Sequence, residues 1–183
     1  MKTNVKIPAP PRWRRLAPQS VRATWLATIA HRGQTDLDGK RYAEHLRRVS
    51  RRTDTADEST VAWLHDTIED TPVTEADLRA HGFSDRVVEA VLAITHWPGQ
   101  DDAEYVEQVL ANELAVTVKQ YDLLDHLETG RGARGRYGDT DWFPPTVMVG
   151  HPKLPFYIDF LGRIDQQLDA SDVPLERGRH SGT

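Results

Sequence analysis

Apolar residues in this chain recur at three- and four-residue spacing, which is the period of one face of an α-helix. The longest such run lies within residues 103–128, where apolar side chains return at heptad-like intervals. The sequence has no sustained alternation of apolar and polar residues bounded by hairpin turns, so no β-strand is predicted. The pattern predicts an all-α fold.

Capping residues and helix breakers divide the first part of this pattern. We expect a first helix that is capped by Ser20 and ends at the turn of Gly33. Its inner face should carry Val21, Trp25, Leu26 and Ile29. A second helix follows in RYAEHLRRVSRR, where the apolar face is formed by Tyr42, Leu46 and Val49.

Later segments continue the helical pattern. A third helix should run from about residue 56 to residue 69, with Asp57 or Thr55 as its cap. Short helices are expected in TEADLRAHG and SDRVVEAVLAITH, and a last amphipathic helix in FYIDFLGRIDQQL. Residues 103–128 form either one long helix or two helices joined near Asn112.

Length and composition favour one helical domain. The chain has 183 residues, which suits a single core, and we assign that core to residues 19–170. Residues 1–18 hold four prolines and an RWRR cluster, which is typical of an arm outside the core. Residues 171–183 form a polar tail.

Composition also excludes several classes of function. The chain has no cysteine, so thiol catalysis, thiolate metal sites and disulfides are excluded. Its net charge of −5 does not favour non-specific binding to nucleic acid. No apolar run resembles a signal sequence or a membrane span, so the cytoplasm is the expected location and no membrane partner is expected. The oligomeric state stays open.

The segment WLHDTIEDTP, residues 63–72, concentrates acidic side chains beside a histidine. If one helix continues through it, His65 shares a face with Glu69, and Asp66 shares a neighbouring face with Asp70. Apolar neighbours tilt these polar columns toward the interior. Buried carboxylates are costly unless they are compensated, and a bound metal cation is one form of compensation.

Imidazole and carboxylate donors without sulfur suit manganese, iron, magnesium or zinc. Further ligands must come from elsewhere, and His31 and Asp122 both interrupt apolar patterns on other predicted helices. Each residue also has an ordinary explanation, since His31 could be favoured by a helix C-terminus and Asp122 could lie on a wet face. Asp66 could likewise be a solvated charge near a helix end. The combination favours a metal site.

Four segments carry a family resemblance: ATIAHRGQ…GKRYAEH, VAWLHDTIEDTPVT, VLAITH and EYVEQVLANELAVTVKQYD. In order and spacing they resemble the HD-domain phosphohydrolases, over about residues 20–128. The branch they resemble most contains the hydrolase domain of the Rel/SpoT-type alarmone enzymes and its small single-domain relatives. This resemblance implies a helical HD bundle around one divalent ion, typically Mn²⁺. The implied ligands are His31, His65, Asp66 and Asp122.

The resemblance also implies roles for neighbouring residues. Glu69 and Asp70 match the acidic pair that positions or activates the attacking water. Lys119 matches a lysine that contacts a substrate phosphate, although a surface lysine is the ordinary alternative. His45 matches the histidine of a PYxxH stretch whose proline is replaced here by Arg41, and it is either a neighbour of the ligands or a core histidine.

The chain departs from this branch at positions that bear on the substrate. Residues 36–38, Asp-Leu-Asp, replace basic residues in the turn after the GQ pair. Leu123 and His126 stand where an arginine and an asparagine are common. His126 could contact substrate, add a metal ligand or be a surface histidine. In the loop GRGARGRYG, Arg134 could bind phosphate, but a flexible solvated loop is the ordinary alternative.

These observations lead to one expected activity and two alternatives. The expected activity is metal-dependent (p)ppGpp 3′-pyrophosphohydrolysis, so the partner is a small nucleotide. The first alternative is an HD phosphatase acting on another nucleotide, for example NADPH or a nucleoside phosphate. The second is a non-catalytic HD domain that binds a nucleotide.

Overall fold

The computed structural model describes residues 5–9, 16–35, 39–129 and 154–171. In these residues the chain forms helices and no β-strand, which confirms the all-α prediction. A single-residue bridge between Thr35 and Arg41 closes the turn after the first helix. Parts of the predicted arm, residues 1–4 and 10–15, and nearly all of the predicted tail lie outside the described residues.

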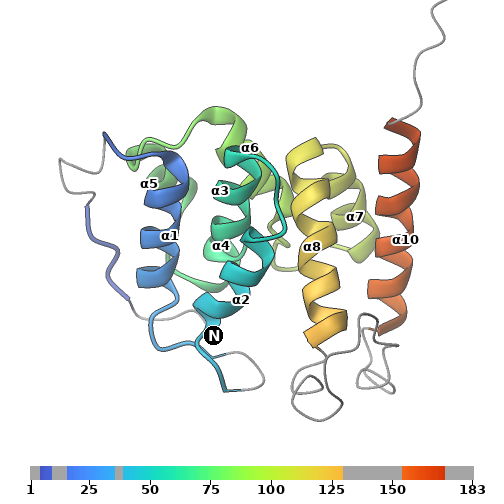
Figure 1. Cartoon of the computed structure of the whole chain (residues 1–183), viewed down its shortest axis with the longest axis horizontal. Helices are drawn as coiled ribbons and strands as arrows, with labels where there is room; N and C mark the ends of the chain where they lie inside the picture. The colour runs from blue at the N-terminus through green and yellow to red at the C-terminus, as the bar shows by residue number, and fades with distance from the viewer. Residues whose placement is uncertain (1–4, 10–15, 36–38, 130–153, 172–183) are drawn as a thin grey trace, which may run out of the picture.

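The helices follow one another along the chain as Figure 1 shows. They are α1 (Gln19–Ala30), α2 (Tyr42–Ser50), α3 (Ala56–Leu64), α4 (Thr67–Asp70), α5 (Glu75–Ala80), α6 (Asp85–Ile94), α7 (Asp102–Leu110), α8 (Glu113–Thr129) and α10 (Leu154–Ser171). No helix in this part of the chain is long and apolar enough to cross a membrane.

Helix α3 lies at the centre of the bundle and packs against α1, α2, α6 and α8. Helix α8 then joins this group to α7 and α10. The core contains fully buried side chains from helices along the whole described chain, including Leu26, Leu46, Leu64, Leu123 and Phe160. Burying each such side chain contributes roughly 1.5–3 kcal/mol. The elements that carry residues 63–72, the HD segment, are therefore packed from several sides.

The first helix differs from its prediction. It begins at Gln19, directly after Pro18, and Ser20 lies inside it without capping it. The predicted inner face is also shifted, because Val21 is 53% exposed. The buried face is formed mainly by Ala23, Leu26, Ala27 and Ala30. Small side chains on this face allow close packing of α1 against α3, which an apolar period alone does not reveal.

The third predicted helix is interrupted within the HD segment, so the prediction of one continuous helix over residues 56–69 was wrong. Helix α3 ends at Leu64, and α4 starts at Thr67. The Thr67 hydroxyl donates to the carbonyl of Leu64 at 2.6 Å and closes the junction locally. His65 and Asp66 therefore project from a junction and not from neighbouring columns of one straight helix.

Residues 103–128 form two helices, α7 and α8, which is one of the two arrangements that the sequence predicted. The break lies at Asn112, whose side-chain oxygen accepts a hydrogen bond from the backbone of Ala115 at 3.0 Å. This contact satisfies an amide at the start of α8. Helix α8 is thus free to take its own direction and to bring Asp122 into the interior.

Removing the cap of α3 should destabilise the fold without touching the interior. Thr55 accepts from the Glu58 amide, and the Glu58 side chain accepts from the Thr55 amide, so both halves of a capping box are present. Thr55→Ala should lower the free energy of unfolding by about 1 kcal/mol, measured by urea denaturation. The control is Thr117→Ala inside α8, which should change stability by less than about 0.5 kcal/mol. Equal losses in both variants would contradict a capping role.

Candidate metal centre

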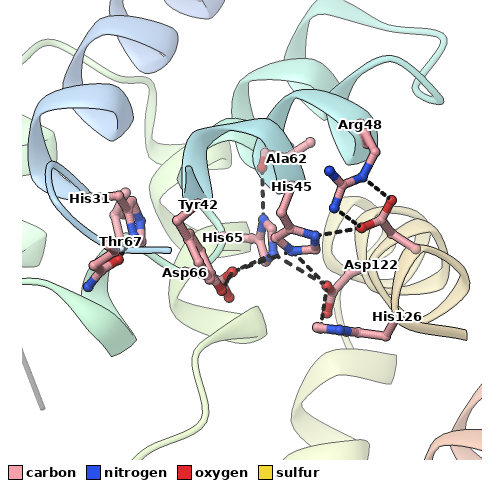
Figure 2. A network of polar contacts seen from close by, with 12 residues as sticks. His31, Tyr42, His45, Arg48, Ala62, His65, Asp66, Thr67, Asp122 and His126 are labelled. Carbon is pink, nitrogen blue, oxygen red and sulfur yellow. Dashed lines mark hydrogen bonds and ion pairs between the residues drawn. The ribbon is translucent and has the colours of Figure 1, made fainter. Parts of the chain in front are cut away.

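Four polar side chains from separate parts of the chain meet inside the bundle (Figure 2). His45 comes from α2, His65 and Asp66 from the junction of α3 and α4, and Asp122 from α8. Ligand atoms of His45, His65 and Asp122 all lie within 4.8 Å of one another, and all three residues are buried. Nitrogen and oxygen donors this close together can surround one divalent ion.

Both histidines of this group are anchored through their Nδ1 atoms. His65 Nδ1 donates to the carbonyl of Ala62 at 2.8 Å, and His45 Nδ1 donates to Asp125 Oδ2 at 2.8 Å. The other ring nitrogen, Nε2, then faces the group in both cases. Neither Nε2 atom has a hydrogen-bond partner, although both are buried. Anchoring of one nitrogen leaves the other available as a metal donor.

The carboxylates face these nitrogens. Asp66 Oδ2 lies 2.9 Å from His65 Nε2 and also accepts a hydrogen bond from the Tyr42 hydroxyl at 2.6 Å. Asp122 Oδ1 lies 3.2 Å from His45 Nε2 and 3.6 Å from His65 Nε2. Asp122 Oδ1 is itself buried without a hydrogen-bond partner. The donor atoms of His45, His65, Asp66 and Asp122 therefore face one another across a small space, which is the candidate metal centre.

Charge in this centre is strongly coupled. Burial alone would lower the pKa of His65, but Asp66 and Asp122 outweigh burial and leave that pKa well above its usual value. Burial alone would raise the pKa of Asp122, but Lys119 and then His126 hold it well below its usual value. The buried carboxylate of Asp122 therefore stays ionised, and its charge must be compensated by positive charge nearby. A divalent cation would supply this positive charge and displace the protons from the histidine Nε2 atoms. The nitrogen and oxygen donors present therefore fit a metal ion.

His31 occupies a separate position. It lies at the end of α1, and its ring stacks on Tyr42 with centroids 4.8 Å apart. Its Nδ1 donates to the side-chain oxygen of Gln34, and its Nε2 is buried without a hydrogen-bond partner. Tyr42 also contacts the edge of His45, so the tyrosine ring stands between the two histidines. The Nε2 atom of His31 is thus available as a metal donor, but His31 is not part of the group formed by His45, His65 and Asp122. Its role as a ligand stays a prediction.

The predicted catalytic acids lie on α4, directly after the centre. Glu69 is exposed, and its carboxylate accepts a hydrogen bond from the amide of His96 at 3.0 Å. Asp70 is half-buried, and its carbonyl accepts from the Gln34 side chain at 2.9 Å. Burial, and then the charges of Asp66 and Glu69, raise the pKa of Asp70 to about 6. A carboxylate with this pKa is suited to proton transfer near neutral pH.

Two of the predicted substrate contacts point to Asp122. Lys119 donates to Asp122 Oδ2 at 2.8 Å and lies over the Tyr105 ring. His126 Nε2 lies 3.1 Å from Asp122 Oδ1, and its ring stacks on Tyr157 of α10 with centroids 5.8 Å apart. The side chain of His126 is 27% exposed, and its role as a substrate contact stays a prediction. Both side chains border the centre.

The remaining positions predicted to bear on the substrate lie outside the described residues or in the core. Arg134 and its loop, and the acidic turn at residues 36–38, lie outside the described residues. Leu123, which replaces a common arginine of the branch, is fully buried in the core. The side chain at this position belongs to the hydrophobic core.

A comparison with known proteins identifies the fold. No protein-family model and no curated protein matches the sequence. One solved structure aligns with a TM-score of 0.60 and 20% identity, over 84% of this chain and 93% of that chain. That protein is described as a metazoan ortholog of SpoT that hydrolyzes ppGpp and plays a role in starvation responses. This chain has the HD fold. At this identity the likeness concerns the fold alone.

Sequence reasoning missed three residues that support the centre of the HD fold. Tyr42 was assigned to the apolar face of its helix, yet its hydroxyl binds Asp66. Arg48 and Asp125 were not considered, yet Arg48 donates to Asp125, and Asp125 accepts from His45. A usable signal existed, because Arg48 follows His45 by three residues, and Asp125 follows Asp122 by three, so each lies on the face of its neighbour.

The predicted ligands can be tested by metal content. His65→Ala and Asp122→Ala should each abolish stoichiometric Mn²⁺ binding, because each removes a buried donor, and His31→Ala should do so if His31 is a ligand. The measurement is metal analysis after dialysis, with folding checked by circular dichroism. The matched control is His81→Ala, since His81 is also buried but packs against Trp25. Unchanged metal content in the His65 and Asp122 variants would refute the centre.

Proposed function

We propose that this protein is a metal-dependent phosphohydrolase of phosphorylated nucleotides, and that its substrate is (p)ppGpp, cleaved at the 3′ ester. One observation carries the proposal: buried Nε2 atoms of His45 and His65 face Asp122 Oδ1, and none of the three atoms has a hydrogen-bond partner. The HD fold, shared with a protein that hydrolyzes ppGpp, supports the choice of substrate.

The ion would be held by His45, His65 and Asp122, whose donor atoms lie within 4.8 Å of one another. Asp66 and His31 are the further ligands that the sequence predicts. Imidazole and carboxylate donors favour a hard or borderline divalent ion, and we propose Mn²⁺. When bound, such an ion activates water and polarises a phosphoryl oxygen.

The reaction replaces one phosphorus–oxygen bond with another. The oxygen of water bonds to the phosphorus attached to the 3′ oxygen, the bond from phosphorus to the 3′ oxygen breaks, and that oxygen leaves and takes up a proton. The products are GDP and pyrophosphate. Asp70 accepts the proton that water loses, since its raised pKa of about 6 makes its carboxylate a competent base at neutral pH. Glu69, anchored to the His96 amide, orients the water beside it.

Lys119 supplies positive charge for the substrate. Burial would lower its pKa, but Asp122 outweighs burial and leaves that pKa well above its usual value. The ammonium group is therefore charged at the edge of the centre, 2.8 Å from Asp122 Oδ2. A phosphate oxygen can share this group. His126, on the next turn of α8, contributes a ring nitrogen on the same side.

A second candidate is hydrolysis of another phosphorylated nucleotide, for example NADPH or a nucleoside phosphate. One observation favours it, because Leu123 replaces a common arginine and is fully buried. Asp125, two residues later on α8, is already hydrogen-bonded to His45 and Arg48. The basic contacts expected for an alarmone are thus altered on α8, and the metal chemistry is unaffected by that change.

Product analysis tests the substrate. Mn²⁺-loaded protein should convert ppGpp to GDP and pyrophosphate, measured by ion-exchange chromatography. Asp70→Asn with Glu69→Gln should bind Mn²⁺ normally and lose activity by roughly 10²–10⁴-fold, the usual contribution of general base catalysis. Absence of both products from metal-loaded wild type would reject ppGpp, and a panel of other nucleotides would then test the second candidate. A panel without turnover would favour a non-catalytic nucleotide-binding domain.

The pH profile tests Asp70. Its raised pKa means that the carboxylate becomes protonated as pH falls through about 6, so the base is lost on the acid side. The value of kcat/KM should therefore fall on the acid side, with a midpoint at or below pH 6, because a bound cation favours the carboxylate form. Metal occupancy is measured at each pH as a control. An identical acid limb in the residual activity of Asp70→Asn would assign the titration to another group.

A further inference from the structure

The connection between α6 and α7 binds one of the two proposed catalytic acids. The backbone amide of His96 donates to the carboxylate of Glu69 at 3.0 Å. Glu69 is exposed and lies on α4, a helix of four residues. A glutamate side chain has several rotatable bonds, so a carboxylate in water would take many positions. The place of the His96 amide therefore determines where this carboxylate is held.

The residues that follow His96 form a tight turn. In residues 97–100, WPGQ, the Gln100 amide donates to the carbonyl of Trp97 at 3.0 Å. Proline in the second position, and Gly99 with a φ of +82° in the third, match a type II β-turn. The Gln100 side chain also accepts from the Trp97 amide at 3.1 Å. The His96 amide is thus joined directly to a turn with a defined shape.

Gln108 of α7 binds this connection to the rest of the bundle. Its Nε2 donates to the carbonyls of Ala93 at 2.9 Å and Thr95 at 3.0 Å, with a longer contact to Leu92 at 3.3 Å. These carbonyls lie at the end of α6, where backbone acceptors lack partners within the helix. Gln108 Oε1 accepts from Gln100 Nε2 at 3.0 Å. One side chain therefore joins the end of α6, the turn and α7.

We propose that Gln108 is a positioning residue for Glu69, acting through the end of α6 and the His96 amide. The inference rests on the proposed function, in which Glu69 orients the attacking water. Without the hydrogen bonds of Gln108, the end of α6 could shift, and the His96 amide would shift with it. The Glu69 carboxylate would then lose its fixed place.

Gln167 of α10 makes the same kind of contact at another helix end. Its Nε2 donates to the carbonyl of Leu110, the last residue of α7, at 2.7 Å. Like Gln108, it is half-buried. The end of α7 leads to Asn112, whose side chain accepts from a backbone amide of α8, whereas the end of α6 leads to the amide that binds Glu69. Gln167 is therefore a matched control for a general loss of stability.

The first measurement needs no substrate. Amide hydrogen exchange of His96 is followed by NMR in wild type, Glu69→Ala and Gln108→Met, because methionine has a similar length and no amide group. Exchange should be roughly 10-fold faster in both variants, the factor expected for loss of a hydrogen bond to a charged group. Gln167→Met should leave this rate unchanged. Exchange at the wild-type rate in Gln108→Met would overturn the proposal.

The second measurement separates positioning from binding. Gln108→Met should lower kcat by roughly 10- to 100-fold, because a small misplacement that starts far from the reacting atoms can cost this much. KM, Mn²⁺ affinity and the activity of Gln167→Met should be unchanged. In the Glu69→Ala background, Gln108→Met should lower kcat by less than about twofold, because the group that it positions is absent. A full additional loss in that background would overturn the positioning role.

Gln100→Met provides a second variant if Gln108→Met does not fold. It removes the acceptor of the Trp97 amide and the donor to Gln108, on the exposed side of the same connection. Exchange at His96 should again be faster and kcat lower, and wild-type values of both would overturn the proposal. Failure of wild-type protein to hydrolyse ppGpp would reject the proposed substrate, whereas the exchange rates would still show whether Gln108 holds the amide that binds Glu69.

Discussion

The buried carboxylate of Asp122 is the group on which the rest of the site depends. A single charge in the interior of a bundle is tolerated only when its surroundings compensate it. Lys119 lies 2.8 Å from Oδ2, and His126, His45 and His65 approach Oδ1 at 3.1, 3.2 and 3.6 Å. These partners come from three parts of the chain, so the charge organises the packing of α2, α3 and α8 around it.

Much of this arrangement was predictable from the sequence. Helical periodicity predicted the all-α class, and the HD segment together with Asp122 predicted buried donors that the structure does bring together. The interruption between Leu64 and Thr67 was not predictable from apolar spacing, because it depends on a hydroxyl binding a nearby carbonyl. The buried face of α1 was misplaced because alanine is a weak hydrophobic signal.

The orientation of side chains was beyond the reach of the sequence pattern. Tyr42 fits an apolar face as a ring, yet its hydroxyl selects Asp66 as a partner. His45 was an ambiguous histidine until Asp125 and Arg48 were seen on its far edge. Tyr42 and Asp66 are 24 positions apart in the chain, and Asp125 is 77 to 80 positions from its partners Arg48 and His45. Local sequence spacing does not reveal which of these residues meet.

Helix α10 lies beyond the stretch that resembles known hydrolases, yet it packs into the same hydrophobic core. Phe160 and Ile164 are fully buried in the common core, and Tyr157 stacks on His126 beside the centre. A boundary drawn where the motifs end, near residue 128, would open the core on that side and leave His126 without its aromatic cover. The recognisable sequence is therefore shorter than the stretch of chain that builds the common core.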